Sequence, residues 1–205
     1  MNGCVIAGIG TEIGKTLVSA IIVEALSADY WKPIQSGSLE HTDTDAVKAL
    51  VGPHERAFHP EAYRLRVPAS PHAAAAAQGV VIEADRLTLP ETERFLVVEL
   101  AGGLMVPLND DTLNIDMVQR WGLPVILVAS YYLGSINHSL LSIEALRRRN
   151  IAVSGIVFNG EPVAATRSII LSYSGLDSLL DIPHTDSVSR SFVAARAQEF
   201  RDERA

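Results

Sequence analysis

The residues with the clearest chemical signature form a glycine-rich loop close to the N-terminus. Positions 8–16 read Gly-Ile-Gly-Thr-Glu-Ile-Gly-Lys-Thr, between a short apolar run and a segment with helical periodicity. Glycines let backbone N–H groups turn toward an anion, and the following helix presents the positive end of its dipole. In such a loop Lys15 reaches the β- and γ-phosphates of a nucleotide, and the Thr16 hydroxyl binds Mg²⁺. The segment therefore predicts an ATP site.

The spacing of this loop differs from the usual one. Five residues separate Gly8 from Gly14, whereas a spacing of four would need glycine at position 9, which is Ile9. The alternative is a glycine-rich strand-to-helix turn that binds nothing. Because Lys15 and Thr16 follow an apolar strand and open a helix, the context favours phosphate binding.

Phosphoryl transfer also needs acidic metal ligands at the carboxyl ends of neighbouring strands. Glu99 fits because it follows the apolar run 95–98, although it could instead cap the next turn. Asp45 is a weaker candidate, since acidic clusters of this kind are more often helix caps. Lys32 precedes Pro33, and this context on its own is more typical of a solvated loop residue.

Hydrophobic patterning predicts the elements that position these residues. Apolar runs without alternation, as expected for strands covered on both faces, lie at 4–7, 95–98, 124–129, 153–158 and 179–182. Helical segments are expected at 15–27, 44–50, 70–78, 114–121, 136–149, 164–174 and 191–203. Strands that alternate with helices require a parallel sheet. The predicted fold class is α/β: a single P-loop NTPase domain over residues 1–205, with a mostly parallel β-sheet flanked by helices.

Composition narrows the class of protein. The chain has 205 residues, of which 48% are hydrophobic and 20% charged, as in ordinary globular domains. A formal charge of −7, with no basic run longer than residues 147–149, argues against a nucleic-acid partner. Cys4 is the one cysteine, so an intrachain disulfide is impossible. No apolar run reaches the roughly 18 residues that span a bilayer, and we expect a cytoplasmic protein with no membrane partner.

Six blocks of the sequence, in order, resemble the dethiobiotin synthetase family. The family's loop, Gly-Thr-Asp-Thr-Glu-Val-Gly-Lys-Thr, has the same five-residue spacing as positions 8–16. The other similar blocks lie at 31–37, 45–46, 68–72, 98–103 and 133–138. Leu100 stands where the family has glycine, and Asn159 where it has an adenine-contacting Asn. The resemblance extends to about position 185.

This resemblance implies an ATP- and Mg²⁺-dependent ligase that acts on 7,8-diaminopelargonic acid and CO₂. Its products are dethiobiotin, ADP and phosphate. CO₂ adds to one neutral amine to give a carbamate, which takes the γ-phosphoryl group to form a carbamic–phosphoric anhydride, and the second amine closes the ring. Ammonium groups on Lys15 and Lys32 would lower the pKa of the attacking amine.

The resemblance also implies roles for individual residues. The implied catalytic residues are Lys32, Lys15 and Thr11, and the implied metal ligands are Thr16, Asp45 and Glu99. The implied ATP-binding residues are Glu12, Ile13, Gly14, Lys15, Thr16, Leu17, Asp45, Glu99, Leu100, Ala101, Gly102, Asn159, Gly160, Pro183, His184 and Thr185. The implied substrate-binding residues are Thr11, Lys32, Ser36, Gly134, Ser135, Ile136 and Asn137. The last four begin a helix whose positive end suits a carboxylate, and we expect them to complete the substrate site of the other subunit in a homodimer.

Two other classes share the phosphate loop. Partition- or septum-type switch ATPases carry a second lysine early in the loop, and positions 8–13 contain none. The ATP-binding half of a cobyrinate-type amidotransferase would need a glutaminase domain with a nucleophilic cysteine, whereas Cys4 lies in the predicted first strand.

Overall fold

Seven parallel strands form the main sheet. A computed structural model describes residues 2–203, so residue 1 and residues 204–205 of the predicted domain lie outside the described residues. In chain order the strands are β1 (Gly3–Gly8), β2 (Asp29–Trp31), β4 (Phe58–His59), β6 (Leu96–Gly103), β7 (Val125–Ser130), β8 (Val153–Asn159) and β9 (Ser178–Ile182). Their order in the sheet is β4-β2-β6-β1-β7-β8-β9, and all pairs are parallel. The α/β fold with a parallel sheet is confirmed, as are its five predicted strands.

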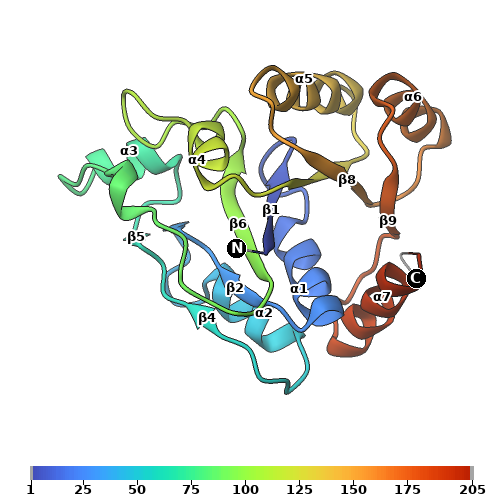
Figure 1. Cartoon of the computed structure of the whole chain (residues 1–205), viewed down its shortest axis with the longest axis horizontal. Helices are drawn as coiled ribbons and strands as arrows, with labels where there is room; N and C mark the ends of the chain where they lie inside the picture. The colour runs from blue at the N-terminus through green and yellow to red at the C-terminus, as the bar shows by residue number, and fades with distance from the viewer. Residues whose placement is uncertain (1, 204–205) are drawn as a thin grey trace.

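Helices cover both faces of this sheet. They are α1 (Lys15–Leu26), α2 (Asp43–Leu50), α3 (Pro71–Ala76), α4 (Asn114–Trp121), α5 (Ser135–Arg148), α6 (Ala164–Ser174) and α7 (Arg190–Asp202). Figure 1 shows α1 and α7 packed together on one side of the sheet and α5 beside α6 on the other. The seven predicted helices are confirmed, with ends that differ by at most two residues.

The centre of the sheet is β1, which pairs with β6 on one side and β7 on the other. Every residue of β1 is buried, and apolar residues such as Val5 and Ile6 each contribute about 1.5–3 kcal/mol when fully enclosed. Because parallel strands all point the same way, the ends of β1 and β6 meet at one edge of the sheet. The loop after β1 is thereby held beside Glu99 and Gly102.

A second, smaller sheet was not predicted. It consists of β3 (Ile34–Ser36) and β5 (Tyr63–Leu65), and α3 packs against both strands. A 3₁₀ turn at Ala84–Arg86 was missed as well. Strands of three residues are too short to show a hydrophobic period, so sequence pattern alone does not reveal them.

Within residues 2–203, no helix is both long enough and apolar enough to cross a bilayer.

Candidate active site

The phosphate loop joins β1 to α1, and glycine at position 14 is required by its geometry. Gly14 has φ 95°, and a Cβ placed there would lie 2.2 Å from Nδ2 of Asn159. The same amide nitrogen donates a hydrogen bond of 3.0 Å to the carbonyl of Ile13. Asn159, at the end of β8, therefore braces the loop just before the helix begins. Inside the loop, Lys15 Nζ donates to the carbonyl of Gly10 over 3.0 Å.

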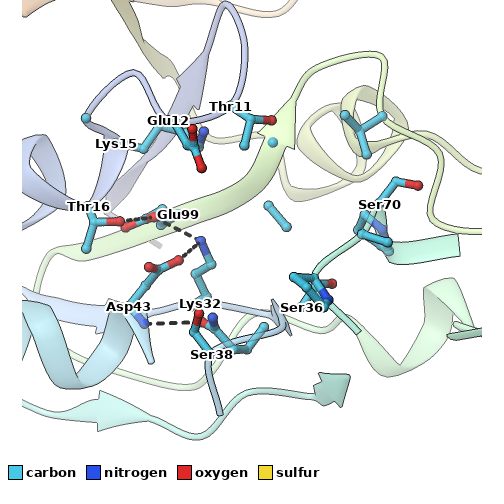
Figure 2. A pocket seen from close by; sticks show the side chains of 18 of the residues that line it. Thr11, Glu12, Lys15, Thr16, Lys32, Ser36, Ser38, Asp43, Ser70 and Glu99 are labelled. Atoms are coloured by element: carbon cyan, nitrogen blue, oxygen red, sulfur yellow. Dashed lines mark hydrogen bonds and ion pairs between the residues drawn. The ribbon is translucent and has the colours of Figure 1, made fainter. Parts of the chain in front are cut away.

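Glu99 is the centre of a buried polar cluster beside this loop. Its carboxylate is fully enclosed, and its Oε1 accepts hydrogen bonds from Thr16 Oγ1 and Lys32 Nζ, both at 2.9 Å. Its Oε2 accepts a hydrogen bond of 2.9 Å from the hydroxyl of Tyr30. Figure 2 shows the Thr16 and Lys32 side chains reaching Glu99 from opposite directions. Three elements, α1, β2 and the turn after β2, thus converge on one carboxylate of β6.

Lys32 is held between two carboxylates. Its Nζ lies 2.5 Å from Oδ2 of Asp43 and 2.9 Å from Oε1 of Glu99. Burial lowers the pKa of Lys32, but the charges of Glu99 and Asp43 outweigh burial and hold this pKa above its usual range. Lys32 is therefore a buried permanent cation, and the solvated-loop interpretation of its sequence context is wrong.

The Lys15 ammonium is in a different electrostatic situation. Burial, followed by the neighbouring charge of Lys32, lowers the pKa of Lys15 to about 8. The Glu99 and Asp43 carboxylates oppose this effect only in part. Lys15 and Lys32 are therefore close enough to repel each other.

The Tyr30 hydroxyl stays protonated beside Glu99. Burial and the charge of Glu99 raise the pKa of Tyr30 well above its usual range, so its hydroxyl remains a hydrogen-bond donor.

Asp45 does not reach this cluster, contrary to the expectation that it would bind metal. It is exposed, and its Oδ2 accepts hydrogen bonds from the backbone N–H and the hydroxyl of Thr42. The Thr42 hydroxyl in turn accepts from the backbone N–H of Asp45, which completes a capping box at the start of α2. The carboxylate that faces the site is Asp43, at the first position of the same helix. The spacing Thr-x-x-Asp was the signal that could have assigned Asp45 to the cap.

These groups line one cavity of about 710 Å³. Figure 2 shows Thr11, Glu12 and Lys15 on one wall and Ser36, Ser38 and Ser70 on the other. The cavity brings together ten of the sequence-predicted site residues, which are Thr11, Glu12, Gly14, Lys15, Thr16, Lys32, Ser36, Glu99, Ala101 and Gly102. The lining residues outside the predicted set are Gln35, Ser38, His41, Asp43, Pro68, Ala69, Ser70, Pro71 and Val106.

Other predicted residues lie outside this cavity. Ile13 and Leu100 are buried in the core, and Leu17 packs against it. Leu100 has a negative φ, so its side chain occupies the family's glycine position without backbone strain. Gly160 follows β8, and Pro183, His184 and Thr185 follow β9. Residues 134–137 cap and begin α5, where Asn137 lines a separate surface cavity of about 330 Å³.

The donor set at Glu99 suits a hard divalent cation. Mg²⁺ is usually bound by one or two carboxylates together with substrate phosphates and water. Thr16, Asp43 and Glu99 offer one hydroxyl and two carboxylates, and the two acids already surround a cation, the Lys32 ammonium. Within the described part of the chain, no group of three or more His, Cys, Asp or Glu gathers as a metal site. The hydroxyl and the two carboxylates therefore fit Mg²⁺ bound together with nucleotide phosphates.

The parallel sheet, the loop at β1 and the carboxylates beside it define a P-loop nucleotide-binding protein. The family described as AAA domain matches residues 2–191. The ATP-dependent dethiobiotin synthetase BioD of Cytophaga hutchinsonii is 46% identical over 96% of this chain and 96% of its own. That of Christiangramia forsetii is 47% identical over 96% and 94%, and that of Bradyrhizobium diazoefficiens 51% identical over 81% and 79%. The chain belongs to the ATP-dependent dethiobiotin synthetase family, whose members are ATP-dependent ligases.

A solved structure adds the likeness of the fold alone. The ParA family ATPase from Chlorobium tepidum superposes with a TM-score of 0.58 over 97% of this chain and 99% of its own, at 12% sequence identity. The switch-ATPase alternative thus shares the architecture, whereas sequence identity joins the chain to the ligases.

Proposed function

We propose that the chain forms the cyclic urea of dethiobiotin from 7,8-diaminopelargonic acid, CO₂ and ATP, with Mg²⁺. The observation that carries the proposal is the convergence of Lys15, Lys32, Asp43 and Glu99 on one cavity beside the phosphate loop. Family membership supplies the substrate class. A nucleotide-driven condensation between small molecules needs a charged cavity in which the reactants displace water, because water would otherwise hydrolyse the activated intermediate.

The first step needs a neutral amine next to positive charge. One amine of the substrate attacks CO₂, forming a C–N bond and releasing a proton as the carbamate forms. The ammonium groups of Lys15 and Lys32 favour the neutral form of that amine and the negative charge of the carbamate. The lowered pKa of Lys15, caused by burial and then by Lys32, supports the idea that this cavity disfavours a further cation.

The second step transfers the γ-phosphoryl group. A carbamate oxygen attacks phosphorus, the bond to the bridging oxygen breaks, and ADP leaves. Thr16, Asp43 and Glu99 would hold Mg²⁺, which supplies charge neutralisation on the transferred group when it is bound. Lys15 neutralises the β- and γ-phosphates from the loop side. The second amine then displaces phosphate from the mixed anhydride and closes the ring.

The carboxyl end of the substrate is proposed to bind a partner subunit. Residues 134–137 do not line the main cavity of their own chain, yet they lie at the N-terminus of α5, where backbone N–H groups suit a carboxylate. Three apolar residues are exposed nearby: Leu133 in the loop before α5, Leu141 on α5 and Tyr173 on α6. An exposed apolar surface around Asn137 supports a homodimer in which each α5 closes the other subunit's cavity.

The test is product formation with and without the diamine at fixed bicarbonate. Carbon-13 from bicarbonate should appear in the urea carbonyl, with one ADP released per ring closed, and omission of the diamine should stop ADP release. Lys15→Ala, which removes the phosphate-binding cation, should abolish turnover. Steady ATP hydrolysis that ignores the diamine would instead favour the switch-ATPase class, and more than a tenth of wild-type activity in Lys15→Ala would contradict the role of the loop.

A further inference from the structure

The hydroxyl of Tyr30 has an unusual partner for a core residue. Tyr30 lies in β2, is fully buried and packs against Phe58. A tyrosine in such a place ordinarily contributes its ring to the core and turns its hydroxyl toward a backbone group or water. Here the hydroxyl donates to Oε2 of Glu99 over 2.9 Å.

The sheet register explains how the two side chains meet. Tyr30 is opposite Val97 in the parallel pairing of β2 with β6. Glu99 is two residues beyond Val97, so it points to the same face of the sheet. The tyrosine side chain is long enough to reach from its position opposite Val97 to Glu99, two residues further along β6. A shorter side chain at this position would contact only Val97.

The two oxygens of Glu99 have different surroundings. Oε1 accepts from Thr16 and Lys32, both of which line the nucleotide cavity. Among residues 2–203, Tyr30 is the hydrogen-bond donor to Oε2. The Glu99 side chain is only 1% exposed, so water is a poor replacement for a donor that is lost. The Tyr30 hydroxyl therefore fixes which oxygen faces the core and which faces the cavity.

We propose that Tyr30 is a positioning residue that holds Oε1 of Glu99 toward the cavity for Mg²⁺-dependent nucleotide binding. The inference rests on the proposed metal role of Glu99. When Thr16 and Lys32 turn to the metal and to the substrate, the Tyr30 hydroxyl remains as the donor that keeps the carboxylate in place. Without it, the buried carboxylate must rotate to satisfy Oε2, and the metal loses an aligned oxygen.

The test measures the factor by which Mg²⁺ tightens ADP binding, by calorimetry with and without the metal. Tyr30→Phe keeps the ring and removes the hydroxyl, and should lower this factor about tenfold, as expected for a hydrogen bond to a buried charge. The affinity for metal-free ADP should change less than about twofold. The binding factor does not depend on the diamine, so it is separable from any failure to form product.

Two further variants make the result specific. Tyr63→Phe is the matched control. Tyr63 is a buried tyrosine in β5 of the smaller sheet, and its hydroxyl accepts a 2.9 Å hydrogen bond from the backbone N–H of Glu83. It should leave the Mg²⁺ factor unchanged. In a Glu99→Gln background, Tyr30→Phe should have no further effect on the factor. The proposal is overturned if Tyr30→Phe keeps the wild-type factor, lowers it equally in the Glu99→Gln background, or weakens metal-free ADP to the same degree.

Discussion

Lys32 and Glu99 form a buried ion pair, with Nζ and Oε1 2.9 Å apart and with side chains only 5% and 1% exposed. Asp43 completes the contact from the other side of the ammonium. The cation between the two acids is therefore part of the protein. In the proposed mechanism, Mg²⁺ held by the same acids would free the Lys32 ammonium to face the carbamate.

Replacing Lys32 with alanine separates its two roles. We expect Lys32→Ala to reduce urea formation about a hundredfold or more, as for other losses of a buried charge that stabilises a reacting anion. Metal-free ADP should bind with much less change, because Lys15 serves the phosphates. Lys48→Ala is a suitable control, since Lys48 is an exposed lysine on α2. Equal losses of product formation and of ADP affinity would place Lys32 at the nucleotide instead.

Asp43 and Asp45 form a natural pair of matched variants. Asp43→Asn should weaken Mg²⁺-dependent ADP binding, because a hard cation prefers an anionic oxygen. Asp45→Asn removes the charged member of the α2 capping box and should lower the melting temperature slightly, with the Mg²⁺ titration unchanged. A Mg²⁺ titration that shifts for Asp45→Asn but not for Asp43→Asn would reverse this assignment.

The lowered pKa of Lys15 predicts a pH dependence of nucleotide binding. With a pKa of about 8 in the empty site, Lys15 is mostly charged below pH 8 and mostly neutral above it. A bound diphosphate favours the charged form, so binding near pH 8.5 should take up a proton, and ADP affinity should fall as the pH rises past 8. Calorimetry in buffers of different ionisation enthalpy measures this uptake. Lys15→Arg stays charged and should bind ADP with no uptake from this position, so an unchanged uptake would assign the proton elsewhere.

The shared-site arrangement predicts complementation between two defective variants. Asn137→Ala should raise the KM for the diamine, and Lys15→Ala should be inactive. A hybrid dimer of the two chains contains one site with an intact Lys15 and an intact Asn137, so mixing should restore part of the activity. The measurement needs verified subunit exchange. Full activity in a protein that sediments as a monomer, or no recovery in exchanged mixtures, would contradict the shared site.

Local patterns were sufficient to predict much of the fold and the loop. Each long strand contains a mostly apolar run, and the glycine-lysine-threonine sequence at 14–16 lies where strand and helix must join. Glu99 was found because it ends such a run. The small sheet escaped because β3 and β5 have three residues each.

The missed parts of the site depend on contacts between distant segments. Asp43 and Asp45 differ by two positions, and only the turn into α2 decides which of them faces Lys32. Tyr30 is 69 residues from Glu99 in sequence and lies in a buried strand. Its sequence context therefore does not indicate that its hydroxyl contacts a residue of the site. Leu100 shows the converse, since a large residue at a family glycine is accommodated by burial of its side chain in the core.

The central place of β1 has a consequence for the order in which the protein is built. This strand precedes both of its neighbours in the sequence, because it pairs with residues near 96 on one side and near 125 on the other. At synthesis rates of about 5–20 residues per second, the edge of β1 that pairs with β6 stays open for roughly 5 to 20 seconds, and the edge that pairs with β7 for roughly 6 to 25 seconds. The phosphate loop has no support during that interval. Nucleotide therefore cannot assist the early stages of folding, because the strand that leads into the phosphate loop is held on both sides only after β7 has been made.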